Sequence, residues 1–467
     1  MYLTKIRIKN LKCFEDVALE FPRDERGGCA GWFVLLGENG LGKSSLLQAM
    51  SLGIVGPRTG QELLSTEERA RWVRHGAERV EIEPSLSFVE LRIVGLFGGL
   101  DKAPRTKASG RRVEGAGFLQ VNGSASGDAG GDDDLTIKGQ PPAQFYGGGP
   151  WSVTPFLPLC GLGYGPRRVV RERGGAMRKL SSRTPRERSR HATLFDTSAL
   201  LFDGEHLLCS LLNAENDPTQ PETNRAVFRK RRARLTSLLN SLLESEGLSV
   251  AQVRPSEVLY ADRQGAQVTL DSLSDGFRSF LSLILDMLAH LHLSGVGMAE
   301  GAADPLDALE TLEGVVLIDE ADVHLHPSWQ RRLGDKLRAV FPRVQFIVTT
   351  HSPFIAQSAT PNGLFRLRSD GGKVTVEQVQ MDPEGQTADQ LLLSELFDLP
   401  STRDTDTEAK MLRRQALLSQ VSRSPDEERE LLALGDELNL RLRRSGEDLR
   451  DRELMDRAWA LLRGGGR

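Results

Sequence analysis

Residues 37–45 read G-E-N-G-L-G-K-S-S and fit the phosphate-binding pattern G-x-x-x-x-G-K-[ST] over its full length. The apolar run at residues 32–36 predicts a buried strand before this stretch, and residues 45–50 predict the start of a helix after it. In that setting, glycines let backbone N–H groups and a helix N-terminus face an anion. The alternative, an ordinary glycine-rich turn, does not require this strand and helix. We therefore interpret the stretch as a P-loop.

A P-loop assigns specific roles to its side chains. Lys43 is expected to reach the β- and γ-phosphates, and Ser44 is expected to ligate Mg²⁺. The cofactors implied are therefore ATP and Mg²⁺. The residues expected to bind the nucleotide in this loop are Gly37, Asn39, Gly40, Gly42, Lys43, Ser44 and Ser45.

The composition restricts the classes of protein that remain. The chain has 467 residues, enough for a large head with appended helices, and a net charge of −4, which argues against a uniformly basic nucleic-acid coat. No apolar run approaches the length of a membrane span, and the N-terminus lacks a signal-peptide apolar region, so we expect a cytoplasmic protein without a membrane partner. The four cysteines lack C-x-x-C spacing, which indicates neither a zinc site nor a disulfide framework; they are Cys13, Cys29, Cys160 and Cys209.

Two further strands end in polar residues. Residues 314–318 predict a buried strand that is followed by Asp319 and Glu320, the arrangement of a Walker B element. Asp319 is expected to hold Mg²⁺, and Glu320 to polarise the attacking water. Residues 344–350 predict a β-branched strand that ends at His351. We interpret His351 as a γ-phosphate sensor, the alternative being a structural histidine.

The stretch L-S-D-G at residues 273–276 precedes a long apolar helix at residues 281–293. Ser274 and Gly276 would then stand at a helix N-terminus, where an anion binds well. Taken alone, Ser274 could equally be a helix N-cap. The Walker B element that follows favours the anion-binding interpretation.

In this order, the P-loop, L-S-D-G, L-I-D-E and T-H-S stretches resemble the ABC-type ATPase head of the RecF, SMC and OLD group, over roughly residues 1–370. The resemblance implies a homodimer in which two heads sandwich two ATP molecules. It also implies that Ser274 contacts the γ-phosphate held by the P-loop of the other head. Higher oligomers remain possible.

The chain also departs from that family. Residues 321–327, A-D-V-H-L-H-P, are similar to the D-loop variant of RecF- and OLD-like ATPases, so His324 and His326 are interpreted as dimer contacts rather than a metal pair. No long heptad segments flank the L-S-D-G stretch, which excludes a coiled-coil SMC protein. The Q-loop glutamine has no clear counterpart, because Gln144 precedes the strand expected within residues 156–164.

The predicted fold class is α/β: a P-loop NTPase of the ABC-type head with an antiparallel β subdomain, a helical insertion and a helical C-terminal tail. We expect residues 1–198 to form the first part of the head and residues 199–255 the insertion. Residues 256–380 are expected to carry the signature, Walker B and histidine elements. Residues 381–467 are expected to form the helical C-terminal region.

Two basic stretches lie at residues 167–190 and 229–234. The first is expected to be an exposed loop. Each stretch is either a solvated face or a contact surface for nucleic-acid phosphates, so DNA or RNA is a possible partner. Asp404-Thr405-Asp406 resembles the D-x-D of a Toprim nuclease, but no strand–turn pattern surrounds it and a helix N-cap role is sufficient.

The tail that begins near residue 388 resembles that of the compact ATPases of Septu-type and retron-associated anti-phage systems. This resemblance implies an ATPase that controls a separate nuclease effector, of HNH type if the chain is Septu-like, and that has no nuclease activity itself. The apolar stripes after Pro400 and at residues 235–248 offer docking surfaces for it, or pack on the head. Two alternatives remain: a RecF-like repair ATPase that clamps DNA, and a transporter ATPase. The second is disfavoured because the signature reads L-S-D-G-F rather than L-S-G-G-Q.

Overall fold

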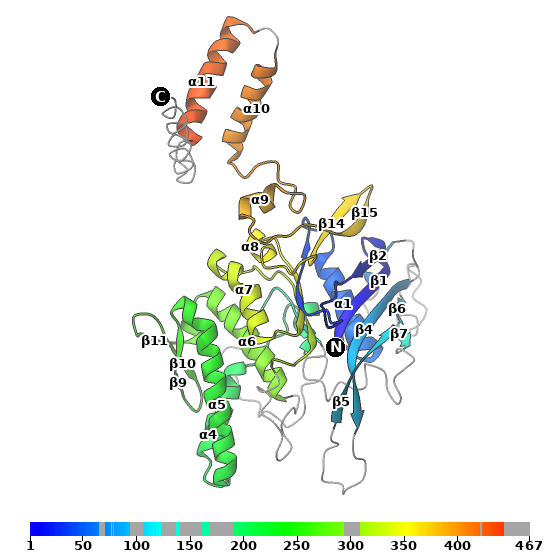
Figure 1. The fold of residues 1–467 in the computed structure, drawn as a ribbon, viewed down its shortest axis with the longest axis vertical. Helices are drawn as coiled ribbons and strands as arrows, with labels where there is room; N and C mark the ends of the chain where they lie inside the picture. Colours follow the sequence, from blue (N-terminus) through cyan, green and yellow to red (C-terminus); the bar gives the residue numbers. More distant parts are fainter. Residues whose placement is uncertain are drawn as a thin grey trace, which may run out of the picture. The chain divides into compact units, whose positions relative to one another are not determined.

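A computed structural model describes most of the chain in two compact units, Met1–Leu391 and Leu392–Arg467 (Figure 1). The described residues are 1–64, 71–75, 77, 79–93, 106–116, 118–122, 137–140, 161–168, 190–293, 309–420 and 423–442.

The first unit opens with an antiparallel sheet in the order β2-β1-β4-β6-β7, with β5 also paired to β4. Its strands are β1 (Tyr2–Leu11), β2 (Phe14–Glu20), β4 (Arg79–Ile93), β5 (Thr106–Ala116), β6 (Phe118–Asn122) and β7 (Ile137–Gln140). Buried Ile6 and Ile8 alternate with exposed Lys5 and Arg7 along β1, so one face of this sheet packs on the core. Strands β1 and β2 pair antiparallel and form a hairpin.

A second sheet has the order β15-β14-β3-β13-β12-β8. Its strands are β3 (Gly31–Leu36), β8 (Leu162–Tyr164), β12 (Gly314–Ile318), β13 (Val344–Thr349), β14 (Leu364–Asp370) and β15 (Lys373–Gln378). All pairs from β8 to β14 are parallel, and only β15 is antiparallel. The carboxyl ends of β3, β13, β12 and β8 therefore lie at one edge, which is where ligands bind in open α/β sheets.

Helix α1 (Lys43–Leu63) joins the two sheets. Its buried residues Leu46, Leu47 and Met50 belong to the same apolar cluster as Ile8 of β1 and Ile347 of β13. Because one cluster contains residues of both sheets and of α1, the start of α1 is held rigidly beside the carboxyl edge of β3.

The remaining helices of the first unit are α3 (Ala192–Phe195), α4 (Gly204–Asn216), α5 (Glu222–Leu243), α6 (Asp275–Leu293), α7 (Pro327–Val340) and α8 (Pro353–Ala356). The 3₁₀ turns η3 (Glu244–Glu246) and η4 (Leu270–Ser272) and the small sheet of β9 (Ser249–Val253), β10 (Val258–Ala261) and β11 (Gln267–Thr269) lie between α5 and α6 in the chain. Figure 1 shows α4 and α5 side by side as an antiparallel pair, which is the helical insertion predicted from the sequence.

Helix α9 (Ala388–Leu393) leads into the second unit, which is a helical hairpin of α10 (Thr405–Ser419) and α11 (Pro425–Leu442). Ion pairs cross the hairpin from Lys410 to Glu437 at 2.6 Å and from Arg413 to Glu430 at 2.8 Å. Among the described helices, none is both long enough and apolar enough to cross a membrane.

The structure confirms the α/β fold with an antiparallel subdomain. The glycine- and aspartate-rich region at residues 98–149 contributes β5 and β7 to this subdomain. Both strands pair antiparallel, β5 with β4 and β7 with β6. Backbone pairing with a neighbouring strand therefore outweighs a composition that disfavours burial.

Candidate nucleotide-binding site

The P-loop lies between β3 and α1, as its pattern predicts. Gly37, Gly40 and Gly42 all have positive φ, at 151°, 83° and 88°. A side chain on Gly42 would also have no room, because a Cβ there would lie 2.7 Å from Sγ of Cys13 and 2.9 Å from the ring of Phe14. Glycine is thus required at this position by both backbone conformation and packing.

Lys43 is buried, and its ammonium group lies over the loop. Nζ donates hydrogen bonds to the carbonyl oxygens of Gly37, at 2.7 Å, and Glu38, at 2.9 Å. The hydroxyl of Ser44 is on an exposed residue, whereas Ser45 is buried and accepts a 3.0 Å hydrogen bond from Nζ of Lys12. Asn39 is exposed at the loop tip.

Asp319 and Glu320 follow β12 at the same edge of the sheet. Thr349, the last residue of β13, donates its hydroxyl to Oδ1 of Asp319 at 2.5 Å and accepts the backbone N–H of Glu320 at 2.8 Å. Glu320 has a φ of 47°, which is unusual for a residue other than glycine. Thr349 therefore fixes both acids of the Walker B element to the neighbouring strand.

Hydrogen bonds also join the residues that follow Glu320 to the residues that follow Thr349. Oδ1 of Asp322 accepts hydrogen bonds from the hydroxyl of Thr350 and from the backbone N–H of His351. His351 itself is exposed at the carboxyl end of β13. The segment that carries Glu320 and the segment that carries His351 are thus bound to each other.

The electrostatics of the site link these residues with the P-loop. Burial lowers the pKa of Lys43, and the negative charges of Asp319, Glu320 and Asp322 oppose that change. Burial also lowers the pKa of His351, followed by the positive charge of Lys43. His351 is therefore a neutral imidazole near pH 7. The structure thus places Lys43, Asp319, Glu320 and His351 within electrostatic reach of one another.

Arg168 is a site residue to which the sequence assigned no role beyond membership of the basic stretch 167–190. It lies four residues beyond β8, is 5% exposed, and donates through Nη2 to the carbonyl oxygens of Asp319 at 2.8 Å and Glu320 at 2.7 Å. Burial lowers the pKa of Arg168 to about 10, against the effect of the nearby acids, so its charge persists at neutral pH. The sequence offered one signal, an arginine directly after a strand of the parallel sheet.

Gln330 of α7 was also missed. Its Nε2 donates to the carbonyl oxygen of Leu325 at 2.8 Å, and its Oε1 accepts the hydroxyl of Ser352 at 2.6 Å. Ser352 in turn caps α8 by accepting the backbone N–H of Phe354. One amide side chain therefore holds the D-loop segment next to the segment that follows His351.

Ser274 and Gly276 lie at the start of α6, which begins at Asp275 rather than at residue 281. Ser274 is exposed. Gly276 packs on the D-loop so closely that a Cβ there would lie 2.4 Å from the carbonyl oxygen of His324. Within the described residues, no hydrogen bond or ion pair joins Ser274 to the P-loop of the same chain. The signature stretch is instead packed against the D-loop.

Aromatic contacts extend this packing into α7. The ring of Trp329 lies 5.2 Å from that of Phe277 and 4.2 Å from that of Phe280, centroid to centroid. His326 caps α7, because its Nδ1 accepts the backbone N–H of Ser328 at 3.3 Å. The described residues contain no group of three or more His, Cys, Asp or Glu side chains that could hold a metal ion.

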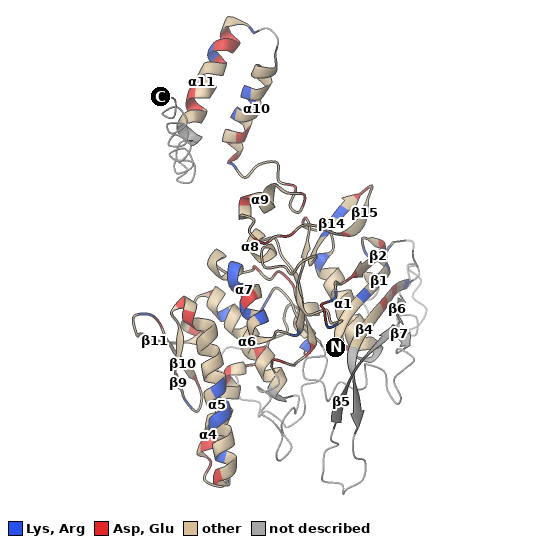
Figure 2. Ribbon diagram, in the orientation of Figure 1, with Lys and Arg blue, Asp and Glu red and all other residues tan. Residues whose placement is uncertain are grey.

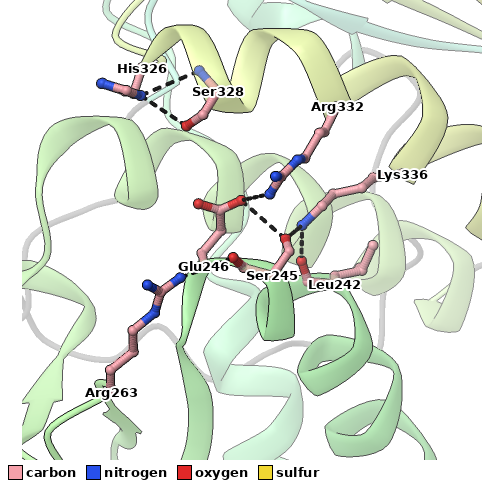
Figure 3. A network of polar contacts seen from close by, with 8 residues as sticks. All are labelled: Leu242, Ser245, Glu246, Arg263, His326, Ser328, Arg332 and Lys336. Carbon is pink, nitrogen blue, oxygen red and sulfur yellow. Dashed lines mark hydrogen bonds and ion pairs between the residues drawn. The ribbon is translucent and has the colours of Figure 1, made fainter.

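Helix α7 is joined on its other side to the helical insertion (Figure 3). Lys336 donates to the carbonyl oxygen of Leu242 and, at 2.7 Å, to the hydroxyl of Ser245. Arg332 forms a 3.1 Å ion pair with Glu246. These two basic side chains bind polar groups at the carboxyl end of α5 and in the η3 turn. The helical insertion and the start of α6 are therefore both held against α7.

Three residues of the basic stretch 167–190, which was expected to form an exposed loop, are described. Arg167 is exposed as expected, whereas Arg168 and Arg190 are buried, and the guanidinium of Arg168 bonds the carbonyl oxygens of Asp319 and Glu320. Residues 169–189 lie outside the described part of the chain, as does Gln144. In the second basic stretch, Arg231 is buried and Glu215 of α4 pairs with two arginines, Arg229 at 3.0 Å and Arg232 at 2.9 Å.

Two family models match the chain. One, described as "AAA domain, putative AbiEii toxin, Type IV TA system", matches residues 176–356, and one described as "AAA domain" matches residues 5–94. Among solved structures, the SMC head domain from Thermotoga maritima is 14% identical with a TM-score of 0.42, covering 82% of this chain and 100% of that one.

Relatives of known name match at low identity. The Septu protein PtuA of Bacillus mycoides (strain KBAB4) is 24% identical over 456 residues, which are 97% of this chain and 53% of that protein. The retron Vc95 probable ATPase of Vibrio cholerae serotype O1 biovar El Tor is 24% identical over 213 residues, 45% of this chain and 40% of that protein. The chain thus spans about half the length of these relatives or less. It is a P-loop protein of the α/β class, related in sequence to the Septu protein PtuA and to retron ATPases.

Proposed function

We propose that the chain is a Mg-ATP-binding and hydrolysing ATPase of the ABC type. The observation that carries the proposal is the convergence of Lys43, Asp319, Glu320 and His351 at the carboxyl edge of one parallel sheet. Four residue types that phosphate chemistry needs come together from three separate parts of the chain. Relatives described as probable ATPases support the same activity.

The residues present fit a magnesium nucleotide. Three glycines with positive φ turn the loop toward the N-terminus of α1, and the Lys43 ammonium group already lies within hydrogen-bond distance of the loop. Ser44 and Asp319 would supply hydroxyl and carboxylate oxygens, which Mg²⁺ prefers as ligands. Thr349 bonds only Oδ1 of Asp319, so Oδ2 is left for the ion. The bound ion would neutralise negative charge on the phosphates. Gly37, Asn39, Gly40, Gly42 and Ser45 complete the loop.

In this proposal Glu320 orients the water that attacks the γ-phosphate. The carboxylate accepts a proton or hydrogen bond from that water, while its backbone is held by Thr349. Neutral His351 can donate one N–H to a γ-phosphate oxygen without adding a charge. Hydrolysis then depends mainly on positioning and electrostatic stabilisation.

We further propose a homodimer with ATP between the heads. Ser274 is exposed at the start of α6, where it is available to a second molecule and is not bonded to its own P-loop within the described residues. The packing of Gly276 on the D-loop supports a joint role for both stretches at that contact. Ser274 and Gly276 would then bind the γ-phosphate of the partner's nucleotide.

The relatives support a role in anti-phage defence, in which the ATPase controls a separate nuclease or other effector in the cytoplasm. The second unit offers a docking surface. Leu412 is 60% exposed and Leu432 is 67% exposed, and a cavity of about 510 Å³ lies beside α10. Leu412 lines this cavity together with exposed Met411 and Leu418, and contiguous exposed apolar surface marks interaction sites. The effector would be of HNH type if the chain functions as a Septu protein.

The RecF-like alternative requires a surface that binds DNA or RNA. Figure 2 shows basic positions along α5, but Arg229 and Arg232 are paired with Glu215, whereas Lys230 is exposed. A RecF-like role would therefore depend more on residues 167–190 than on α5. Charge reversal in that stretch should flatten the salt dependence of DNA binding if the RecF-like alternative is correct, and should leave it unchanged if the stretch is only a solvated face.

The proposal is tested by measuring Mg²⁺-dependent ATP hydrolysis of the purified chain. Glu320→Gln should bind ATP normally but hydrolyse it about 10³-fold more slowly or worse, because only the polarising carboxylate is changed. Lys43→Ala should instead lose ATP affinity in equilibrium titration. Glu310→Gln, at an exposed position ten residues before Glu320, is the matched control and should behave as wild type. Near-normal turnover by Glu320→Gln would refute the assignment.

A further inference from the structure

We propose that Arg168 is a positioning residue for ATP hydrolysis that acts through the backbone of Glu320. The inference rests on the proposed ATPase function. It starts from the location of Arg168, a buried guanidinium that follows β8 and reaches the turn after β12. Both hydrogen bonds from Nη2 end on backbone carbonyl oxygens, those of Asp319 and Glu320, rather than on carboxylates.

The turn at Asp319 and Glu320, to which Arg168 donates, has a backbone conformation that other contacts must stabilise. Glu320 has a φ of 47°, a conformation that a residue other than glycine keeps only where its surroundings hold it there. Thr349 binds the N–H of Glu320 on one side, and Arg168 binds the carbonyl oxygen of Glu320 on the other. The peptide groups before and after the Glu320 Cα are thus both fixed, and with them the direction of its carboxylate.

The charge of Arg168 has a second effect. A buried arginine is costly unless it is compensated, and here Asp319, Asp322 and Glu320 supply the compensation. Because the guanidinium does not bond their carboxylates among the described residues, it leaves Oδ2 of Asp319 and the carboxylate of Glu320 available for Mg²⁺ and water. Arg168 therefore holds the acids near one another without occupying the atoms that they need for chemistry.

The length of the side chain explains why arginine is needed at position 168. A lysine ammonium ends one bond nearer to the backbone than a guanidinium Nη, so Arg168→Lys keeps the charge but cannot reach both carbonyl oxygens. Arg168→Lys should lower kcat about 10²-fold, as expected for a misplaced catalytic group, while the Kd for ATP stays within about twofold of wild type. Arg231→Lys replaces another buried arginine, on α5 away from the site, and should leave kcat and Kd unchanged.

A double-mutant cycle separates positioning from a purely structural role. If Arg168 acts through Glu320, then Arg168→Lys should cause no further loss of single-turnover rate in a Glu320→Gln background. A structural defect would lower both backgrounds equally, and a direct phosphate contact would raise the Kd for ATP in both. Either result overturns the inference. Thermal unfolding of each variant shows which are folded, and Arg168→Gln replaces Arg168→Lys if the latter is not.

The outcomes also separate this inference from the proposed function. A wild-type chain without Mg²⁺-dependent ATP hydrolysis would overturn both. An active wild-type chain whose kcat is unaffected by Arg168→Lys and Arg168→Gln would overturn only the role of Arg168.

Discussion

The hydroxyl of Tyr164 donates a 2.7 Å hydrogen bond to Oδ2 of Asp286, so the strand beside β12 is joined to α6. Oδ1 of Asp286 accepts the backbone N–H of Phe202 at 2.7 Å. The carbonyl oxygen of Tyr164 also accepts the N–H of Asp319 at 2.8 Å. One buried tyrosine therefore connects the Walker B turn with the helix that begins at the signature stretch.

The burial of Asp286 should make stability depend on pH in a specific way. Burial raises the pKa of Asp286 to about 6, so the folded state holds its proton more tightly than the unfolded state. Its contribution to the free energy of unfolding therefore falls as pH rises from about 4 to 6. The neighbouring His290 has a pKa lowered by burial to about 3 and stays neutral across this window.

Tyr164→Phe removes a donor to the ionised carboxylate. We expect a loss of about 1.5–3 kcal/mol in the free energy of unfolding near pH 7.5 and a smaller loss near pH 5, where Asp286 is protonated. Urea unfolding at both pH values measures it. Tyr2→Phe is the control, because Tyr2 donates to the neutral carbonyl oxygen of Arg343 at 2.8 Å and its loss should not vary with pH. Equal losses for Tyr164→Phe at both pH values would contradict the assignment.

The proposed dimer predicts complementation between two inactive variants. Lys43→Ala lacks phosphate affinity and Ser274→Arg blocks the signature stretch, but a mixed dimer contains one site with both elements intact. Mixing the two should restore up to about half of the activity per dimer, and the steady-state ATPase rate checks it. Mixing Lys43→Ala with itself is the control. Continued inactivity despite demonstrated heterodimers would leave Ser274 as a helix cap only.

Gly276 should tolerate no side chain, because of its contact with the D-loop. Gly276→Ala places a methyl group against the carbonyl oxygen of His324, and we expect a destabilisation of about 1–3 kcal/mol and a lower ATPase rate. Gly435 is the matched control, since an added Cβ there meets nothing nearer than 4.0 Å and α11 should gain about 1 kcal/mol from alanine. Chemical unfolding of both variants tests the contrast, which fails if Gly276→Ala is as stable as wild type.

Asp404 provides a test of the expected absence of nuclease activity. Its side chain caps α10 by accepting the N–H of Thr407 at 3.0 Å, which confirms the N-cap role predicted from the sequence. Asp404→Ala should cost about 1 kcal/mol of stability and change no DNA cleavage, because the purified chain should leave plasmid and single-stranded DNA intact with Mg²⁺ or Mn²⁺. Cleavage that survives Glu320→Gln and disappears in Asp404→Ala would revive the nuclease interpretation.

Local sequence was sufficient to predict where the site residues at strand ends lie. Lys43, Asp319 and His351 each follow an apolar run that ends at the carboxyl edge of a parallel sheet, so pattern alone predicts their location. Arg168, Gln330 and the pair of Tyr164 and Asp286 could not be predicted in this way. Their partners are distant in the chain, and which side chains meet depends on tertiary packing.

The same distinction applies to the fold. The hairpin of β1 and β2 alternates apolar and polar residues, and its pattern predicts it. Strand β5 has no comparable pattern, and it forms through pairing with β4. The start of α6 was placed too late because Asp275 and Gly276 favour turns when no packing is considered, whereas the close contact with His324 fixes them in the first helical turn.

The two hydrogen bonds of Lys43 to its own loop give the protein a basis for distinguishing nucleotides by the number of their phosphates. Any ligand that draws the ammonium group away must first replace the carbonyl oxygens of Gly37 and Glu38. A tri- or diphosphate can do so, because its outer oxygens are charged and accept from an ammonium group more strongly than a neutral carbonyl oxygen. A monophosphate that ends short of Nζ gains nothing from the exchange. In the proposed site, AMP and adenosine would therefore compete only weakly with ATP, because neither would offer a charged oxygen to Nζ of Lys43.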